Sequence, residues 1–363
     1  MKFIKKLMDL RTQKLAKLLV NYSVAVKPNE VVIISGELPG QELIKAIYKE
    51  TILNGAHPVI RVNLPGLNSF FYKYGKKHQI ERFPAEFDFM VKNAQKYIGI
   101  ISPSNTKELT EADSKKITAR NKATHAISDY IVNEKNKIRR CTTLFPSESL
   151  AQEAEMDLIN YENFVYSACL LDWKKLGNKM GKILFKFKKN SKVHLIGEGI
   201  NLTFNVHGDK SVADKGEENM PGGEIFMAPV RESLNGYVKF EYPAVNSGKE
   251  VAGIELTFKN GKVIKFNADK NKEFLEEMLN ADENSSYVGE FGIGVNPNIT
   301  KFTKNLLFDE KIDGTIHLAL GMAYKENGGG NDSSIHWDIV KDMSRAKIIV
   351  DGKILQENGV WKI

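Results

Sequence analysis

The fold of the first part of the chain is decided by residues 30–62, which read EVVIISGELPGQELIKAIYKETILNGAHPVIRV. Glu30–Ser35 is a short, largely apolar run with β-branched residues, which is typical of a buried strand in a parallel sheet. Gln41–Asn54 has helical spacing, Gly55 is placed to end that helix, and His57–Val62 predicts a second strand. A strand, a helix and a strand in this order predict an open α/β sheet with mostly parallel strands.

Helical and strand patterns continue on both sides of this stretch. Apolar residues of Leu10–Tyr22 recur at helical spacing, and Tyr97–Ile101 predicts a third strand. Ala119–Ile127 indicates a further element less clearly, and an interrupted helical pattern runs from Leu150 to Phe187.

Beyond about residue 190 the pattern changes to short strands and turns. Asn260-Gly261 and Asp351-Gly352 are dipeptides typical of tight hairpins, and Glu273–Leu279 predicts a helix. The sequence therefore predicts an α/β domain in residues 1–190 and a β-rich α+β domain in residues 191–363. The strands expected in the second domain are Val193–Ile196, Leu202–Val206, Gly236–Phe240, Val251–Phe258, Lys262–Phe266, Thr315–Leu320 and Lys347–Val350.

Composition excludes several classes of protein. The 363 residues are 42% hydrophobic and 27% charged, which is ordinary for a folded domain and unlike a disordered or fibrous chain. The net charge is 52 − 45, or +7, and acidic residues are spread among the basic ones. The densest basic run, Lys182–Lys192, is interpreted as a solvated helix end before a strand. Since no nucleic-acid-binding module is recognisable, we expect no nucleic-acid partner.

The two cysteines, Cys141 and Cys169, are too few for a disulfide framework or a thiolate zinc site. No segment reaches the roughly 18 apolar residues of a membrane-spanning helix, and Met1–Leu10 has no apolar block long enough for a signal peptide. These features predict a cytoplasmic protein without a membrane partner.

Common catalytic motifs are absent from the sequence: it has no HExxH, no GxGxxG after the first strand, no P-loop and no GxSxG. Two glutamates instead stand in unusual surroundings. Glu224 follows a Pro-Gly-Gly turn at the start of an apolar strand, and could equally be a turn or capping carboxylate. Glu290 lies among glycine and apolar residues without a basic neighbour in sequence, so it is either buried with a cation or polar partner, or an exposed or capping acid.

Two histidines accompany these acids. His317 lies in the middle of an apolar strand, where a histidine is commonly a hydrogen-bonded core residue. His336 and Asp338 are two positions apart, so on a strand they share one face; they form either a joint site or a surface pair. The glycines at 328–330 are interpreted as a loop tip or as the border of a site.

Taken together, these residues form a set of two imidazoles and three carboxylates. Oxygen and nitrogen ligands suit Zn²⁺, Mn²⁺ or Co²⁺. Three carboxylates exceed what a single catalytic zinc ion normally uses, and suit two ions with a bridging carboxylate. A serine triad built from Ser333 or Ser334 with His336 and Asp338 is disfavoured, because strand neighbours point side by side rather than at one another.

Several segments resemble the aminopeptidase T/S family of metallo-aminopeptidases, peptidase family M29. The matching stretches are NMPGGEIF at 219–226, GEFGIGVNP at 289–297, GTIHLALGMAY at 314–324 and NDSSIHWDIVKDM at 331–343, with LRTQKLAKLLVNYSVAVKPNEVVIISG at 10–36. The resemblance covers nearly the whole chain. It implies two divalent metal ions (Zn, Co, Mn or Mg), short peptide substrates and a homodimer, in which the first domain serves cavity walls and assembly.

The resemblance also assigns roles to residues. It implies the metal ligands Glu224, Glu290, His317, His336 and Asp338, with Glu290 as a bridging ligand, and it places a family tyrosine at Tyr324. Lys325 stands where relatives often have proline. The implied reaction is attack on the scissile carbonyl by a metal-activated water. Other metal-dependent amidohydrolases or phosphoesterases, and a non-catalytic relative that only binds, remain alternatives.

Overall fold

The computed structural model describes residues 9–246 and 248–363, which divide into two compact units. The first unit contains the described residues up to 170 and residues 216–221, and the second contains 171–215 and 222–363. The chain changes units at Leu170/Leu171 rather than near residue 190, because helix α9 (Trp173–Leu184) packs against strands β7 and β9 of the second unit. Residues 1–8, which carry part of the signal-peptide expectation, lie outside the described residues.

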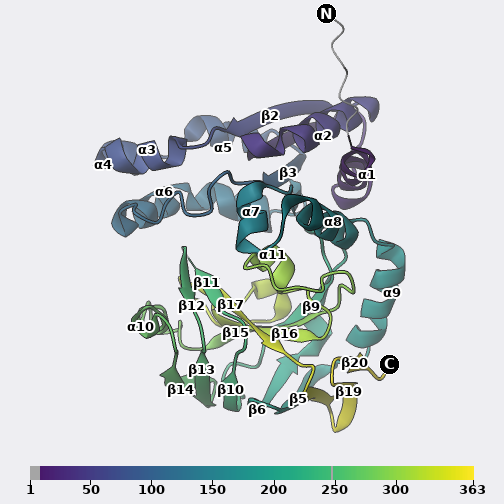
Figure 1. The fold of residues 1–363 in the computed structure, drawn as a ribbon, viewed down its shortest axis with the longest axis vertical. Helices are drawn as coiled ribbons and strands as arrows, with labels where there is room; N and C mark the ends of the chain where they lie inside the picture. The colour runs from purple at the N-terminus through teal and green to yellow at the C-terminus, as the bar shows by residue number, and fades with distance from the viewer. Residues whose placement is uncertain (1–8, 247) are drawn as a thin grey trace, which may run out of the picture. The chain divides into compact units, whose positions relative to one another are not determined.

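The first unit is built on a parallel sheet of five strands in the order β2–β1–β3–β4–β8 (Figure 1). Helix α2 ends as its sequence predicts: Gly55 has a φ of +72°, its N–H donates to the carbonyl of Ile52, and the N–H of Ala56 donates to that of Thr51. This left-handed stop returns the chain to β2, whose pairing with β1 confirms the predicted parallel pattern. The strands are β1 (Val31–Glu37), β2 (His57–Asn63), β3 (Lys96–Ile101), β4 (Arg139–Leu144) and β8 (Asn219–Met220).

Helices connect the strands of this unit. The predicted helix Leu10–Tyr22 is α-helical only to Leu18 and continues as a π-helical turn over Leu19–Ser23. The interrupted pattern predicted from Leu150 to Phe187 is three helices, the last of which belongs to the second unit. The helices of the first unit are α1 (Leu10–Leu18), α2 (Gln41–Leu53), α3 (Leu67–Tyr74), α4 (Lys77–Ile80), α5 (Ala85–Lys92), α6 (Ser114–Asn133), α7 (Glu148–Glu153) and α8 (Leu158–Cys169).

The second unit is mainly antiparallel, so the predicted fold class, an α/β part followed by a β-rich α+β part, is confirmed. An eight-stranded sheet has the order β14–β13–β10–β6–β5–β18–β19–β20, and β11 pairs with β12. Both predicted hairpin turns have two residues of positive φ, at Asn260-Gly261 and Asp351-Gly352. The single strand predicted over Val251–Phe258 is two strands, because the chain turns at Gly253, which has a φ of +66°.

A second, five-stranded sheet in this unit has the order β17–β16–β15–β9–β7. One of its faces is apolar: Phe291 of β15 packs edge-to-face on Phe204 of β6, with ring centroids 5.1 Å apart, and Trp337 of β17 lies against Phe274 of α10. Because side chains alternate along a strand, the intervening residues face the other way and are free to form a polar site.

The remaining bounds place the elements of the second unit in Figure 1. They are β5 (Lys189–Gly197), β6 (Ile200–His207), β7 (Val212–Asp214), β9 (Glu224–Met227), β10 (Asn235–Lys239), β11 (Ala244–Asn246), β12 (Lys249–Val251), β13 (Glu255–Lys259), β14 (Lys262–Asn267), α10 (Lys272–Leu279), β15 (Val288–Gly294), α11 (Leu306–Asp309), β16 (Thr315–Gly321), β17 (His336–Asp342), β18 (Ala346–Val350), β19 (Lys353–Glu357) and β20 (Val360–Trp361).

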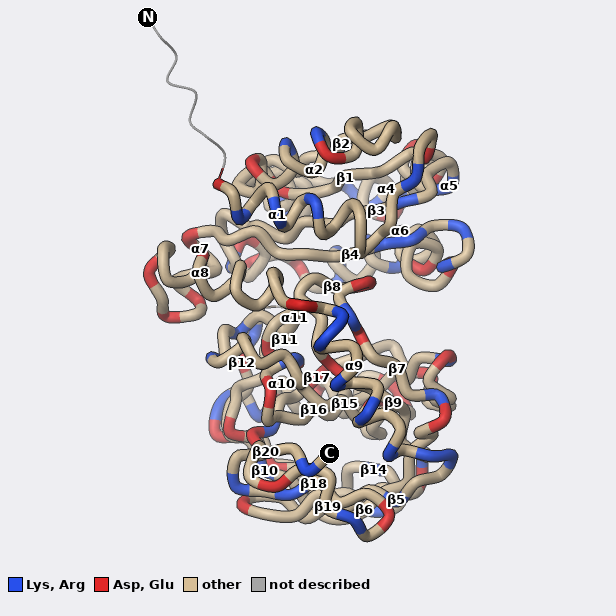
Figure 2. The backbone as a smooth tube through the Cα atoms, turned by 90° about the vertical axis from the view of Figure 1, so that its right-hand side faces the viewer, with Lys and Arg blue, Asp and Glu red and all other residues tan. Residues whose placement is uncertain are grey.

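Neither unit has a large region in which only basic or only acidic residues occur. Basic and acidic residues are interspersed along both units in Figure 2. The basic run Lys182–Lys192 spans the end of α9 and the start of β5 with its lysines exposed, as interpreted from the sequence. Among the described residues, no helix is both long and apolar enough to cross a membrane.

Candidate metal centre

Four neighbouring strands of the five-stranded sheet carry the five side chains singled out from the sequence. Glu224 begins β9, Glu290 lies in β15, His317 lies in β16, and His336 and Asp338 lie in β17. The order β17–β16–β15–β9 places these segments side by side, although they are far apart in the sequence. The structure therefore brings all five onto one region of one sheet.

Strand register determines which of these side chains meet. Glu290 is paired with Ala319, and Ala319 with Asp338, so the two carboxylates flank a small side chain. Two residues further along β15, Gly292 is paired with His317. A Cβ atom on Gly292 would lie 1.9 Å from Nε2 of His317. Glycine at this position thus leaves the space that the imidazole occupies.

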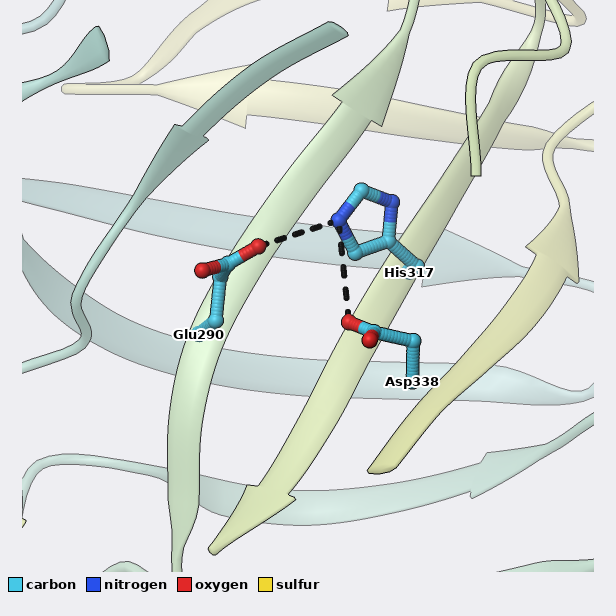
Figure 3. Close-up of side chains that lie close together, drawn as sticks. All are labelled: Glu290, His317 and Asp338. Atoms are coloured by element: carbon cyan, nitrogen blue, oxygen red, sulfur yellow. Dashed lines mark hydrogen bonds and ion pairs between the residues drawn. The ribbon is translucent and has the colours of Figure 1, made fainter. Parts of the chain in front are cut away.

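Three carboxylates surround one imidazole nitrogen. Nε2 of His317 lies 3.3 Å from Oε1 of Glu290, 3.6 Å from Oε2 of Glu224 and 3.9 Å from Oδ1 of Asp338. Figure 3 shows Glu290 and Asp338 reaching this nitrogen from separate strands. All four residues are buried. Such a cluster of acids away from water requires bound protons or cations to compensate its charge.

His336 and Tyr324 lie at the more accessible side of the cluster. Nε2 of His336 is 3.4 Å from Oδ2 of Asp338, and its side chain is 20% exposed. Nδ1 of His336 lies 2.9 Å from the carbonyl oxygen of Met322, which accepts its proton and leaves Nε2 directed at the site. The ring of Tyr324 is 5.1 Å from the His336 ring and 6.3 Å from that of Phe226. The residue predicted as the family tyrosine is therefore beside the cluster.

The three carboxylates differ in their ionisation. Burial raises the pKa of Glu290, and burial together with the charge of Glu310 raises that of Glu224 to about 8. Burial also acts to raise the pKa of Asp338, but the charge of His336 outweighs it and holds the pKa at about 2. Asp338 is thus the carboxylate that is most firmly ionised when no metal ion is bound.

The imidazoles respond to the same charges. Burial opposes their protonation, but the hydrogen bond to Glu290 and the charge of Asp338 raise the pKa of His317 to about 9. The charge of Asp338 raises the pKa of His336 to about 10 against the same burial. Protons therefore compensate the carboxylates in the metal-free protein, and metal binding must release them.

Unsatisfied atoms show that the cluster fits a metal ion. Among the described residues, Oε2 of Glu290 and Oδ1 of Asp338 are buried without a hydrogen-bond partner. Each such atom costs free energy unless a partner is supplied. One ligand atom from each of Glu290, His317 and Asp338 lies within 4.8 Å of the others, a spacing that can surround a cation. Carboxylate and imidazole ligands suit Zn²⁺, Co²⁺ or Mn²⁺.

The sequence reasoning missed residues that support the site. Lys311, whose Nζ lies 3.1 Å from Oε1 of Glu224, gave no signal because it stands in a short connection between α11 and β16. Asp282 was also missed. The two adjacent hydroxyl groups of Ser333 and Ser334 could have indicated that a carboxylate accepts hydrogen bonds from them. Its carboxylate accepts hydrogen bonds from both hydroxyls and from the N–H of Ser334 at 2.6–3.1 Å, and so holds the segment that leads into His336.

Changing Asp282 to Asn is expected to loosen this segment and to lower stability by roughly 1–2 kcal/mol near pH 7, discounted for partial exposure. Desolvation opposes ionisation, but the hydrogen bonds from Ser334, Asn284 and Ser333 hold the pKa of Asp282 at about 2, below the ordinary 3.8. A lowered pKa in the folded state stabilises above the ordinary value, and the effect is lost as the pH falls towards 2. Urea unfolding of both proteins between pH 7 and pH 2 measures the difference, which should shrink below pH 4. A constant difference would contradict this role.

The chain matches known metalloproteases along almost its entire length. Residues 8–361 match the family described as "Thermophilic metalloprotease (M29)". "Aminopeptidase AmpS" of Bacillus subtilis is 26% identical, with 98% of this chain and 100% of that protein covered. "Aminopeptidase 2" of Geobacillus stearothermophilus is 25% identical, with 93% of each covered. The solved structure of wild-type AmpT from Thermus thermophilus has a TM-score of 0.82 at 20% identity, with 97% of this chain and 99% of that chain covered, which shows a shared fold.

The buried carboxylate–imidazole cluster on an antiparallel sheet is a candidate metal centre, and the family match makes the chain a metal-dependent hydrolase. The chain belongs to the M29 family of thermophilic metalloproteases. The enzyme class predicted from the sequence, a metallo-aminopeptidase, is confirmed. The roles of individual residues and the number and identity of the metal ions stay predictions.

Proposed function

We propose that the enzyme removes N-terminal residues from short peptides, using two divalent metal ions held by Glu224, Glu290, His317, His336 and Asp338. The observation that carries this proposal is the convergence of these five side chains on four adjacent strands, with buried oxygens of Glu290 and Asp338 left without partners. Five ligands exceed the needs of one tetrahedral ion and suit a pair. Zn²⁺, Co²⁺, Mn²⁺ and Mg²⁺ are the candidate ions.

The mechanism assigns separate tasks to the residues. Bound divalent ions would supply polarisation of the scissile carbonyl and a water of lowered pKa. Glu290 has one oxygen directed at His317 and the other without a hydrogen-bond partner, so it would be a ligand available to both metal ions. The proton of the attacking water would pass to another acid at the site that has an oxygen free to accept it. Tyr324, beside His336 at the accessible side, is placed to orient a substrate group. The imidazoles of His317 and His336 would complete the ligand set.

The first unit contains none of these five side chains, which all belong to the second unit. We propose that it contributes to assembly of a homodimer and to the walls around the substrate, as the family resemblance implies. Cys141 and Cys169 are both buried, and among the described residues neither is in a disulfide, which supports the proposal of a reducing cytoplasmic location.

The substrate proposal predicts a strict requirement for a free amine and for metal. Purified enzyme should hydrolyse leucine, lysine or aspartate amides and short peptides, and N-acetylation of the same substrates should abolish hydrolysis. Chelation with EDTA should remove activity, and addition of Co²⁺, Zn²⁺, Mn²⁺ or Mg²⁺ should restore it. Metal analysis of the protein as purified identifies the native ion and its stoichiometry.

Three results would contradict the proposal. Faster cleavage of blocked than of unblocked peptides, or of phosphoesters, would indicate another metal-dependent hydrolase. Full activity in protein from which metal analysis detects no ion would exclude metal-activated water. Binding of peptides without turnover under all metal conditions would favour the non-catalytic alternative.

A further inference from the structure

Lys311 is a lysine with no exposed surface beside the candidate metal centre. Its Nζ lies 3.1 Å from Oε1 of Glu224 and also contacts Oε1 of Glu310. The other oxygen of Glu224, Oε2, lies 3.6 Å from Nε2 of His317. The two oxygens of Glu224 are therefore divided between the lysine on one side and the metal centre on the other.

The backbone fixes the position from which this lysine reaches Glu224. The N–H of Lys311 donates to the carbonyl of Phe308, and its own carbonyl accepts from the N–H of Asn296. The Asn296 side chain in turn donates to the carbonyl of Gly222, two residues before Glu224. Lysine and glutamate are thus anchored to a common hydrogen-bonded frame.

The charges around the ammonium group are unbalanced. Glu224 and Glu310 both contact Lys311, and Asp214 of β7 is paired in register with Glu224. A single ammonium near the buried Glu224 and Asp214 and the partly exposed Glu310 does not neutralise all three acids, so cation binding near Glu224 remains favourable despite the positive charge of the lysine.

We infer that Lys311 is a positioning residue: it holds Oε1 of Glu224 and thereby directs Oε2 to the metal ion on that side of the site. This inference rests on the proposed function, because it requires Glu224 to be a ligand. Groups that orient metal ligands in this way commonly change metal affinity by about 10–100-fold when they are removed. The effect should concern the ion that uses Glu224 and should leave the affinity of the other ion unchanged.

Lys341 offers a matched control. It is also buried, it pairs with Glu241, and it lies on β17, the strand that carries Asp338. Because side chains alternate along a strand, Lys341 points to the face opposite Asp338. The variants Lys311→Met and Lys341→Met each remove one buried ammonium and keep most of the side-chain volume, so loss of a buried ammonium and of its ion pair is common to both.

The test is a titration of the metal-free, full-length protein with Co²⁺, followed by calorimetry and by the visible absorption of bound cobalt. We expect the unmodified protein to bind two ions and Glu224→Gln to bind one. Lys311→Met should weaken only the second ion, by roughly 10–100-fold. Lys341→Met should bind both as the unmodified protein does, and Lys311→Arg, which keeps the charge and the donors, should recover affinity relative to Lys311→Met.

The outcomes separate this inference from the proposed function. If Glu224→Gln loses an ion and Lys311→Met binds both ions at least as tightly as the unmodified protein, the positioning role is wrong and the ligand set stands. If Glu224→Gln keeps both ions, the ligand set and the positioning role are both wrong. If Lys311→Met does not fold, Lys311→Gln decides, because its shorter neutral side chain cannot hold Oε1 of Glu224 as the ammonium does. Weaker binding of one ion only supports the role, and two affinities equal to those of the unmodified protein overturn it.

Discussion

Glu290→Gln is expected to lower kcat/KM by roughly 10³-fold or more while leaving the metal-free protein folded, which sets the role of Glu290 apart from that of a core residue. The change keeps the size of the side chain and removes one negative charge from the cluster. Since burial already raises the pKa of Glu290, a neutral amide is cheaper to bury than the ionised carboxylate. The metal-free variant should therefore be at least as stable as the metal-free parent.

With metal present, the order of stability should reverse, and the parent should be more stable than Glu290→Gln. A ligand that binds only the folded state stabilises it by about 2.7 kcal/mol at one hundred times its Kd. Thermal unfolding with and without Co²⁺ or Zn²⁺ measures this gain, which should be large in the parent and much reduced in Glu290→Gln. Activity on an unblocked leucine amide is measured on the same samples.

Asp309→Asn is a suitable control for this experiment. Asp309 is also a buried carboxylate of the second unit, and burial raises its pKa to about 8, but it is satisfied by the N–H and hydroxyl of Thr303. Its variant should keep the metal-dependent gain in stability. Equal gains in Glu290→Gln and the parent would show that Glu290 is not a ligand.

The sequence predicted turns, helix ends and short strand–helix–strand segments well, because residues close together in the sequence determine these features. The helix stop at Gly55 and the turns at Asn260-Gly261 and Asp351-Gly352 require positive φ, which these residue types adopt readily, so their patterns carry the structure directly. The pairing of β1 with β2 similarly follows from a short strand–helix–strand segment.

The boundary between the two units could not be predicted from such local patterns. Helix α9 has an ordinary amphipathic pattern, and nothing in that pattern states which sheet its buried face contacts. The excursion of residues 216–221 into the first unit depends on β8 pairing with β4, a contact between segments far apart in the sequence. Long-range pairing of this kind is a property of the folded chain.

For the site, the sequence supplied candidate residues and the strand register supplied their arrangement. The period of two placed His336 and Asp338 on one face, and residue type and resemblance added Glu224, Glu290 and His317. The contact of Lys311 with Glu224 depends on how two connections pack and leaves no periodic trace. The role of Gly292 was hidden for the same reason, because it appears only once β15 is paired with β16.

Gly292→Ala is the second change with a large expected effect. The added Cβ would lie 1.9 Å from Nε2 and 2.0 Å from Cε1 of His317, whose ring has no exposed surface into which it could move. We expect the imidazole to be displaced or the strands to separate, with a loss of roughly 1–3 kcal/mol in stability typical of overpacking. Displacement of Nε2 from Glu290 and Asp338 should also abolish tight metal binding and, with it, most of the activity.

A double variant tests whether the collision with His317 is the cause. If it is, Gly292→Ala combined with His317→Ala should be more stable than Gly292→Ala alone, because the second change removes the obstructing ring, while metal binding stays lost. Gly181→Ala serves as the control, since a Cβ at Gly181 in α9 would meet nothing within 4 Å. Denaturant unfolding and Co²⁺ titration give both quantities for five proteins: the unmodified protein, Gly292→Ala, His317→Ala, the double variant and the Gly181→Ala control. Additive losses in the double variant would place the effect of Gly292 in the backbone rather than in the space it leaves for the imidazole, and the packing argument for this glycine would then fail.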